Sequence, residues 1–144
     1  MTELDAALVR RKLAAITRDL SDLERVRDLS LAEYRDDRFR KKAAERLLQE
    51  AIEAAVDANL HVLRAAGHAA PSDYFGSFVA VGRAGILSAE LAEALAPSAG
   101  LRNRLVHEYD EIDDRKVLEA VGSAIRDLGA YVEAVEAYLE REGV

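Results

Sequence analysis

The feature that most constrains the fold of this chain is a long helical repeat over residues 37–66. Small and apolar side chains recur there at every third or fourth position, as they do along one face of an α-helix. They are Phe39, Ala43, Leu47, Ala51, Ala54, Ala58, Val62 and Ala65. Because alanine adds little side-chain volume, a neighbouring helix can approach this face closely. We therefore predict a central helix against which the rest of the chain packs.

The remaining segments also follow a helical period. Apolar residues repeat at spacings of three and four over residues 4–27 and 113–140. Shorter helices are predicted after Ser72 and Ser88, since serine is a favoured residue at helix N-termini, and Pro97 should stop or kink the second of them. We find no alternating strand pattern and no internal repeat. The sequence predicts an all-α fold, an up-and-down bundle of roughly four or five main helices.

Length and composition indicate a single domain spanning residues 1–144. A chain of 144 residues has the usual size of one domain, and half of its residues are hydrophobic. The absence of cysteine excludes disulfides, thiolate catalysis and zinc fingers, and is compatible with a reducing compartment. The first residues do not resemble a signal peptide, and no apolar run approaches the ~20 residues of a membrane span. We expect a cytoplasmic protein.

The charge balance argues against binding nucleic acid by bulk electrostatics, because the formal net charge is −7. A local basic site is still compatible with this balance. One basic cluster comprises Arg35, Arg38, Arg40, Lys41, Lys42 and Arg46, and a second comprises Arg102 and Arg104. A run of charges is most often a solvated helix face, and we interpret the first cluster in this way.

Residues 100–113 concentrate hydrogen-bonding and titratable side chains. Within about two helical turns the stretch carries Arg102, Asn103, Arg104, His107 and Tyr109. On an ideal helix Arg102 and His107 lie about 140° apart, so they would flank a groove and would not stack on each other. Asn103 is one turn from His107 and can pair with it. One chain therefore offers half a site, which a two-fold dimer with these helices facing each other would complete.

Arginine and histidine together suit phosphodiester chemistry on RNA. The planar arginine fork donates parallel hydrogen bonds to a phosphate, and histidine moves protons near neutral pH. His107 would take the proton from a 2′-hydroxyl or give one to the leaving oxygen, while Arg102 would stabilise charge on the phosphate oxygens. No metal or other cofactor is needed if the RNA supplies the nucleophile. The spacing is not specific, and an ordinary surface helix is the alternative.

A polar stripe on the long helix is a second candidate site. Asp57 and His61 are four residues apart and can touch. They could form a solvated face with a simple Asp–His hydrogen bond, or support the site at residues 100–113. A metal site that also includes Glu53 is the third interpretation. It is the weakest, because one helix stripe offers too few converging ligands.

The pattern around Arg102 resembles the signature of a known family. Arg102-Asn103-x-x-x-His107-x-Tyr109 is similar to the Arg-x4-His-x-Tyr motif of HepT-type toxins, which belong to the HEPN superfamily of helical RNases. The resemblance implies a HEPN-like homodimer with a composite site in the cleft between protomers. It also implies a metal-independent endoribonuclease, with Arg102 and His107 catalytic and Asn103 in a supporting role.

The resemblance extends beyond this motif. It includes the alanine-rich helix with Asp57-x-x-x-His61, as further supporting residues, and a Pro-Ser-x-Tyr turn at residues 71–74. Two positions depart from the family pattern. Leu101 stands where many relatives have an aromatic residue, and Pro97 lies close before the motif. Neither departure removes a catalytic group, although the proline could alter how the helix is presented.

The same resemblance implies a regulatory partner. In a type VII-like toxin–antitoxin pair, a minimal nucleotidyltransferase antitoxin would use ATP to transfer AMP onto Tyr109. The added negative charge beside Arg102 and His107 should repel an RNA phosphate. The alternative for Tyr109 is a half-buried packing role. The alternative for the whole chain is a non-catalytic HEPN-like module that binds a nucleotidyltransferase or a nucleotide, which the acidic net charge mildly favours.

Overall fold

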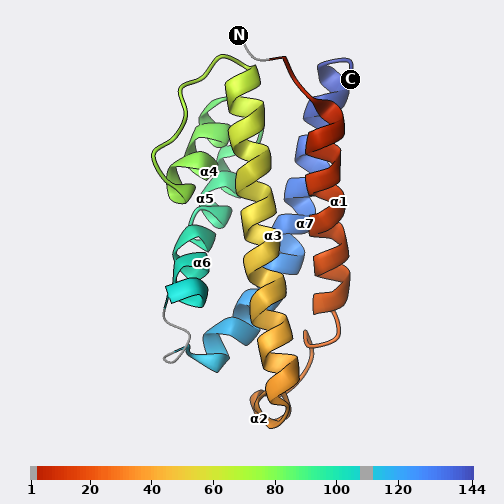
Figure 1. Ribbon diagram of the computed structural model, residues 1–144, viewed down its shortest axis with the longest axis vertical. Coiled ribbons are helices and arrows are strands. Elements are labelled where there is room, and N and C mark those ends of the chain that lie inside the picture. The colour runs from red at the N-terminus through yellow and green to blue at the C-terminus, as the bar shows by residue number, and fades with distance from the viewer. Residues whose placement is uncertain (1–2, 108–111) are drawn as a thin grey trace.

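A computed structural model describes residues 3–107 and 112–144, and every element in these ranges is a helix (Figure 1). The three long helices are α1 (Ala6–Leu23), α3 (Arg38–Ala65) and α7 (Asp114–Arg141). The shorter helices are α2 (Leu31–Asp36), α4 (Tyr74–Arg83), α5 (Ala89–Leu95) and α6 (Ser98–His107). The all-α prediction is confirmed. None of the helices in the described ranges has the length and apolar character needed to cross a bilayer.

The central helix is α3, as the alanine pattern predicts. In Figure 1 α1 packs along one side of it, and α4, α5 and α6 cover the opposite side. The start of the predicted apolar face is wrong, because Phe39 and Ala43 are exposed while Ala44 and Leu48 are buried. The first turns of α3 extend past the end of α1, so they pack against α2 and α7 instead (Figure 1).

Side chains at the helix starts explain several boundaries. Ser88 accepts a hydrogen bond from the third residue of α5, and Asp113 accepts two from the first turn of α7, as their capping roles predict. The prediction that Ser72 caps α4 is wrong. Asp73 takes that role, with its carboxylate 2.7 Å from the Gly76 amide nitrogen, because aspartate one position later is an equally good acceptor.

A buried polar network joins α7, α3 and α4. The Tyr131 hydroxyl lies 2.6 Å from Asn59 Oδ1 and 2.9 Å from the Ala55 carbonyl. The Asn59 amide donates to the Ser77 hydroxyl over 3.2 Å, and this hydroxyl donates to the Tyr74 carbonyl over 2.8 Å. Because buried polar groups are costly when unpaired, the network favours one register of these helices. It places the first turn of α4, which carries Tyr74, beside α3.

Candidate active site

The motif predicted from the sequence lies on α6. This helix starts directly after Pro97 and packs against α3 and α4. Leu105 is buried and Leu101 is half-buried, so these two residues mark the inner side of the helix. Arg102 is therefore carried toward α3 and α4, while Asn103 and His107 are exposed.

Arg102 is held by three neighbours. Its Nε donates to Glu53 Oε1 over 3.2 Å, and its guanidinium carbon lies 4.8 Å from the centre of the Tyr74 ring. Its Nη1 donates to Asn103 Oδ1 over 3.4 Å. The arginine side chain is 21% exposed, so these contacts are partly shielded from water. A charge-assisted hydrogen bond and a cation–π contact together give the guanidinium a defined orientation.

Glu53 is itself positioned from within α3. The same Oε1 atom accepts a hydrogen bond from Gln49 Nε2 over 2.8 Å, one turn earlier on the helix. The two donors thus meet on one carboxylate oxygen of a long, well-packed helix. Because Nε is bonded to Glu53 and Nη1 to Asn103, Nη2 is the nitrogen of the Arg102 fork that has no hydrogen-bond partner among the described residues and is available to a phosphate.

His107 is the last residue of α6 and is exposed, so it is not a core histidine. In the described part of the chain, no side chain is hydrogen-bonded to its imidazole. The predicted pairing of Asn103 with His107 is not formed, and the Asn103 oxygen accepts a hydrogen bond from Arg102. Tyr109 lies outside the described residues.

Asp57 and His61 face a different part of the molecule. Lys12 Nζ of α1 lies 3.1 Å from Asp57 Oδ2, and the Asp5 backbone nitrogen donates to His61 Nε2 over 3.0 Å. Both residues therefore tie the beginning of α1 to α3. The structure does not bring Asp57 and His61 together with Arg102. Within the described residues, no contact supports the role predicted for them in the site.

The geometry does not favour the metal-site interpretation. Glu53, Asp57 and His61 each have a different partner, so their side chains do not converge. Among the described residues, no three His, Asp or Glu side chains are grouped closely enough to hold a metal ion.

Sequence reasoning missed the partners of Arg102. From the sequence, Glu53 is a possible metal ligand on a polar stripe and Tyr74 is only part of the turn at residues 71–74, whereas in the structure Tyr74 is half-buried under the guanidinium. The sequence feature that could have pointed to Glu53 is its position on a polar stripe of the predicted central helix. Spacing along one helix does not show which residue of another helix it faces.

The sequence model of the family described as ribonuclease HepT-like matches residues 16–135 of this chain. This span includes α6 and its motif. The chain belongs to the HepT-like ribonuclease family. A curated relative, the tRNA nuclease HepT of Aphanizomenon flos-aquae, is 37% identical over 139 residues. This similarity covers 96% of the present chain and 95% of the relative.

Solved structures have the same fold. The tri-AMPylated HEPN toxin of Shewanella oneidensis, in complex with its MNT antitoxin, aligns with a TM-score of 0.82 at 23% identity, covering 90% of this chain and 97% of that one. The cytosolic protein YutE of Bacillus subtilis aligns with a TM-score of 0.86 at 15% identity, covering 99% and 95%. At these identities the likeness shows the fold, which is HEPN-like.

Proposed function

We propose that this chain is the RNase toxin of a toxin–antitoxin pair and cleaves RNA without a metal ion. The observation that carries the proposal is the arrangement on α6, where Arg102 is held in one orientation and His107 is exposed at the end of the same helix. Membership of the HepT-like ribonuclease family supports the reaction class. The relative named as a tRNA nuclease supports transfer RNA as the substrate class.

The active form would be a homodimer. Arg102 is directed toward Glu53 and Tyr74, and His107 lies about 140° further around the helix. One protomer therefore does not present both groups to one phosphate from the same side. Two α6 helices related by a two-fold axis would place the arginine of one protomer opposite the histidine of the other.

The proposed reaction uses the RNA's own 2′-hydroxyl. His107 accepts the hydroxyl proton as the 2′-oxygen forms a bond to phosphorus. The bond from phosphorus to the 5′-oxygen breaks, and the imidazolium of the second protomer's histidine gives that oxygen a proton. Arg102 donates hydrogen bonds to the phosphate oxygens, whose negative charge increases in the transition state. The products are a 2′,3′-cyclic phosphate and a 5′-hydroxyl.

The test is cleavage of RNA by the purified chain free of any modifying partner. We expect His107→Ala to lower the cleavage rate by about 100-fold or more, because general acid–base groups contribute at least that much. His68→Ala is the matched control, since His68 is an exposed histidine in the connection between α3 and α4. Wild-type cleavage should also survive excess chelator.

Two results would overturn this function. Cleavage that is unchanged by His107→Ala would remove the histidine from the reaction. A pure, unmodified wild-type dimer that does not cut RNA would favour the non-catalytic module.

Inhibition would come from AMP added to Tyr109 by a minimal nucleotidyltransferase antitoxin. The support is the solved HEPN toxin that is AMPylated and bound to an MNT antitoxin. Tyr109 follows His107 by two positions in the sequence, so an added phosphate would bring negative charge close to the catalytic groups. After incubation with ATP and such a partner, we expect the intact mass to rise by AMP units in the wild type and not in Tyr109→Phe. An equal rise in both would exclude this tyrosine as the acceptor.

A further inference from the structure

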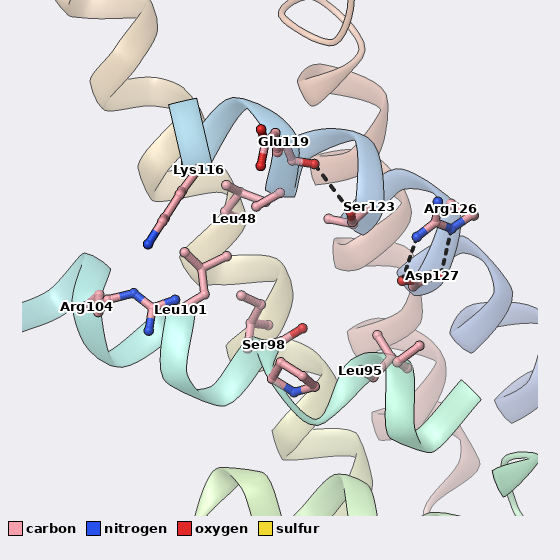
Figure 2. Close-up of a pocket in the computed structure, with 15 residues that line it drawn as sticks. Leu48, Leu95, Ser98, Leu101, Arg104, Lys116, Glu119, Ser123, Arg126 and Asp127 are labelled. Carbon is pink, nitrogen blue, oxygen red and sulfur yellow. Dashed lines mark hydrogen bonds and ion pairs between the residues drawn. The ribbon is translucent and has the colours of Figure 1, made fainter. Parts of the chain in front are cut away.

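A groove of about 470 Å³ lies between α6 and α7 (Figure 2), and Arg102, Glu53 and Tyr74 are not among the residues that line it. Its floor is apolar and includes Leu48 and Ile52 of α3 and Leu101 of α6. The volume falls in the range of about 300–1,000 Å³ that is usual for small-ligand sites. The proposed reaction makes no use of this groove.

Two cations, Arg104 and Lys116, line the same part of the groove. Figure 2 shows Lys116, from the first turn of α7, directed at the guanidinium of Arg104 on α6. The Arg104 fork lies close to Gly100, where a Cβ atom would be 3.4 Å from its Nη1. Both cations also line a smaller hollow beside Asp113, whose carboxylate already accepts two backbone hydrogen bonds.

The charges of Arg104 and Lys116 are not neutralised within the described residues, where neither forms an ion pair. Glu119 lines the same groove one turn beyond Lys116, but its carboxylate is not paired with the lysine. Arg126 differs, because its guanidinium makes two bonds to Asp127, of 3.0 and 3.3 Å. Two facing cations repel each other, and an anion placed between them would remove this cost.

Helix geometry connects the cation pair to the catalytic histidine. Arg104 and His107 are three residues apart, so they lie within about 60° of each other on α6 and are neighbours on its surface. Arg102 and Arg104 lie about 160° apart and face nearly opposite sides. A strand of RNA that reaches His107 can therefore continue past Arg104 into the groove.

The geometry points to a phosphate subsite formed by Arg104 and Lys116, which binds an RNA backbone phosphate next to the one cleaved. The adjoining nucleoside rests on the apolar floor near Leu101. This inference rests on the proposed ribonuclease function. In a chain of net charge −7, the subsite would supply two local positive charges for an RNA phosphate.

The test is binding of a single-stranded RNA in which every ribose is 2′-O-methylated, so that it lacks the nucleophile and stays intact. Each lost phosphate contact should weaken binding about four-fold at 0.15 M salt and reduce the salt slope by about 0.7. Because both cations bind the same phosphate, we expect up to this four-fold loss for Arg104→Ala and for Lys116→Ala, and about the same four-fold loss for the double variant. Arg126→Ala removes the same charge from the same groove, but from an existing ion pair, so it should change the affinity less than two-fold.

Each outcome decides one question. Equal effects of Arg104→Ala and Arg126→Ala, in folded proteins with the same melting curve, would overturn the subsite, because only general charge would matter. Unchanged RNA binding together with altered self-association in gel filtration would make the groove an interface between copies, which also overturns it. If the wild type neither binds the methylated RNA nor cuts ordinary RNA, the ribonuclease function itself fails. Cleavage without any effect of the groove variants would reject the subsite alone.

Discussion

The two sides of α6 differ in how firmly they hold their side chains. On one side, Arg102 is bonded to Glu53, stacked on Tyr74 and only 21% exposed. On the other side, Arg104 and His107 are exposed and form no ion pair with the described residues. One short helix thus presents a pre-oriented arginine and an open basic surface.

This difference has a physical consequence for catalysis. An arginine that is already oriented loses little side-chain entropy when it meets a phosphate, so more of its interaction is available to the transition state. An exposed histidine can reach a substrate proton without first breaking a protein contact. The held side suits charge stabilisation, and the open side suits substrate entry and proton transfer. The following variants test whether the two sides act differently.

The largest effect on the held side should come from Glu53→Ala. Without this carboxylate Arg102 loses its Nε partner, and misplacement of a positioned group can lower a rate by about ten-fold or more. We expect the loss in kcat, with little change in KM, because Glu53 is a positioning residue that does not touch RNA. Initial rates of RNA cleavage over a range of substrate concentrations measure this split.

Glu50→Ala is the control for that variant, because Glu50 lies on the same helix and pairs with the exposed Arg46. Glu53→Gln should recover part of the rate, since the amide oxygen can still accept from Arg102. A faster Glu53→Ala enzyme would reverse the interpretation, because the carboxylate would then compete with RNA phosphate for the arginine.

A smaller effect on the same side is expected from Tyr74→Leu. The substitution removes the ring face under the guanidinium, and a cation–π contact at such a site is worth about 0.5–1 kcal/mol, or roughly a three-fold change in rate. Tyr74→Phe keeps the ring and should retain nearly the full cleavage rate. If both variants lose activity equally, the tyrosine hydroxyl matters and the stacking contact does not. If neither variant changes the cleavage rate, the contact between Tyr74 and Arg102 does not contribute to catalysis.

Much of the fold could be predicted because the signals are local. Apolar spacing marks the helices, and residues such as Ser88 and Asp113 satisfy the free amides at their starts. The predictions that were wrong concern features that depend on the surrounding structure. Phe39 continues the apolar spacing of α3 but is 89% exposed, because it lies on an open hollow between the start of α3 and the end of α1. Asp73 replaced Ser72 as a cap because adjacent residues of similar chemistry compete for one position.

The candidate site also has features that could be predicted from the sequence and features that could not. The sequence by itself determined the helical class, the Arg-x4-His-x-Tyr motif, the family it resembles and the separation of Arg102 and His107 around one helix, since all of these depend on residue type and helical period. Only the tertiary structure decided that Arg102 meets Glu53 and Tyr74, that Asp57 and His61 bind the start of α1, and that Arg104 faces Lys116. The physical reason is that contacts between helices depend on how the helices cross and rotate about their axes. These quantities result from packing of the whole core and are not encoded in the spacing along any one helix.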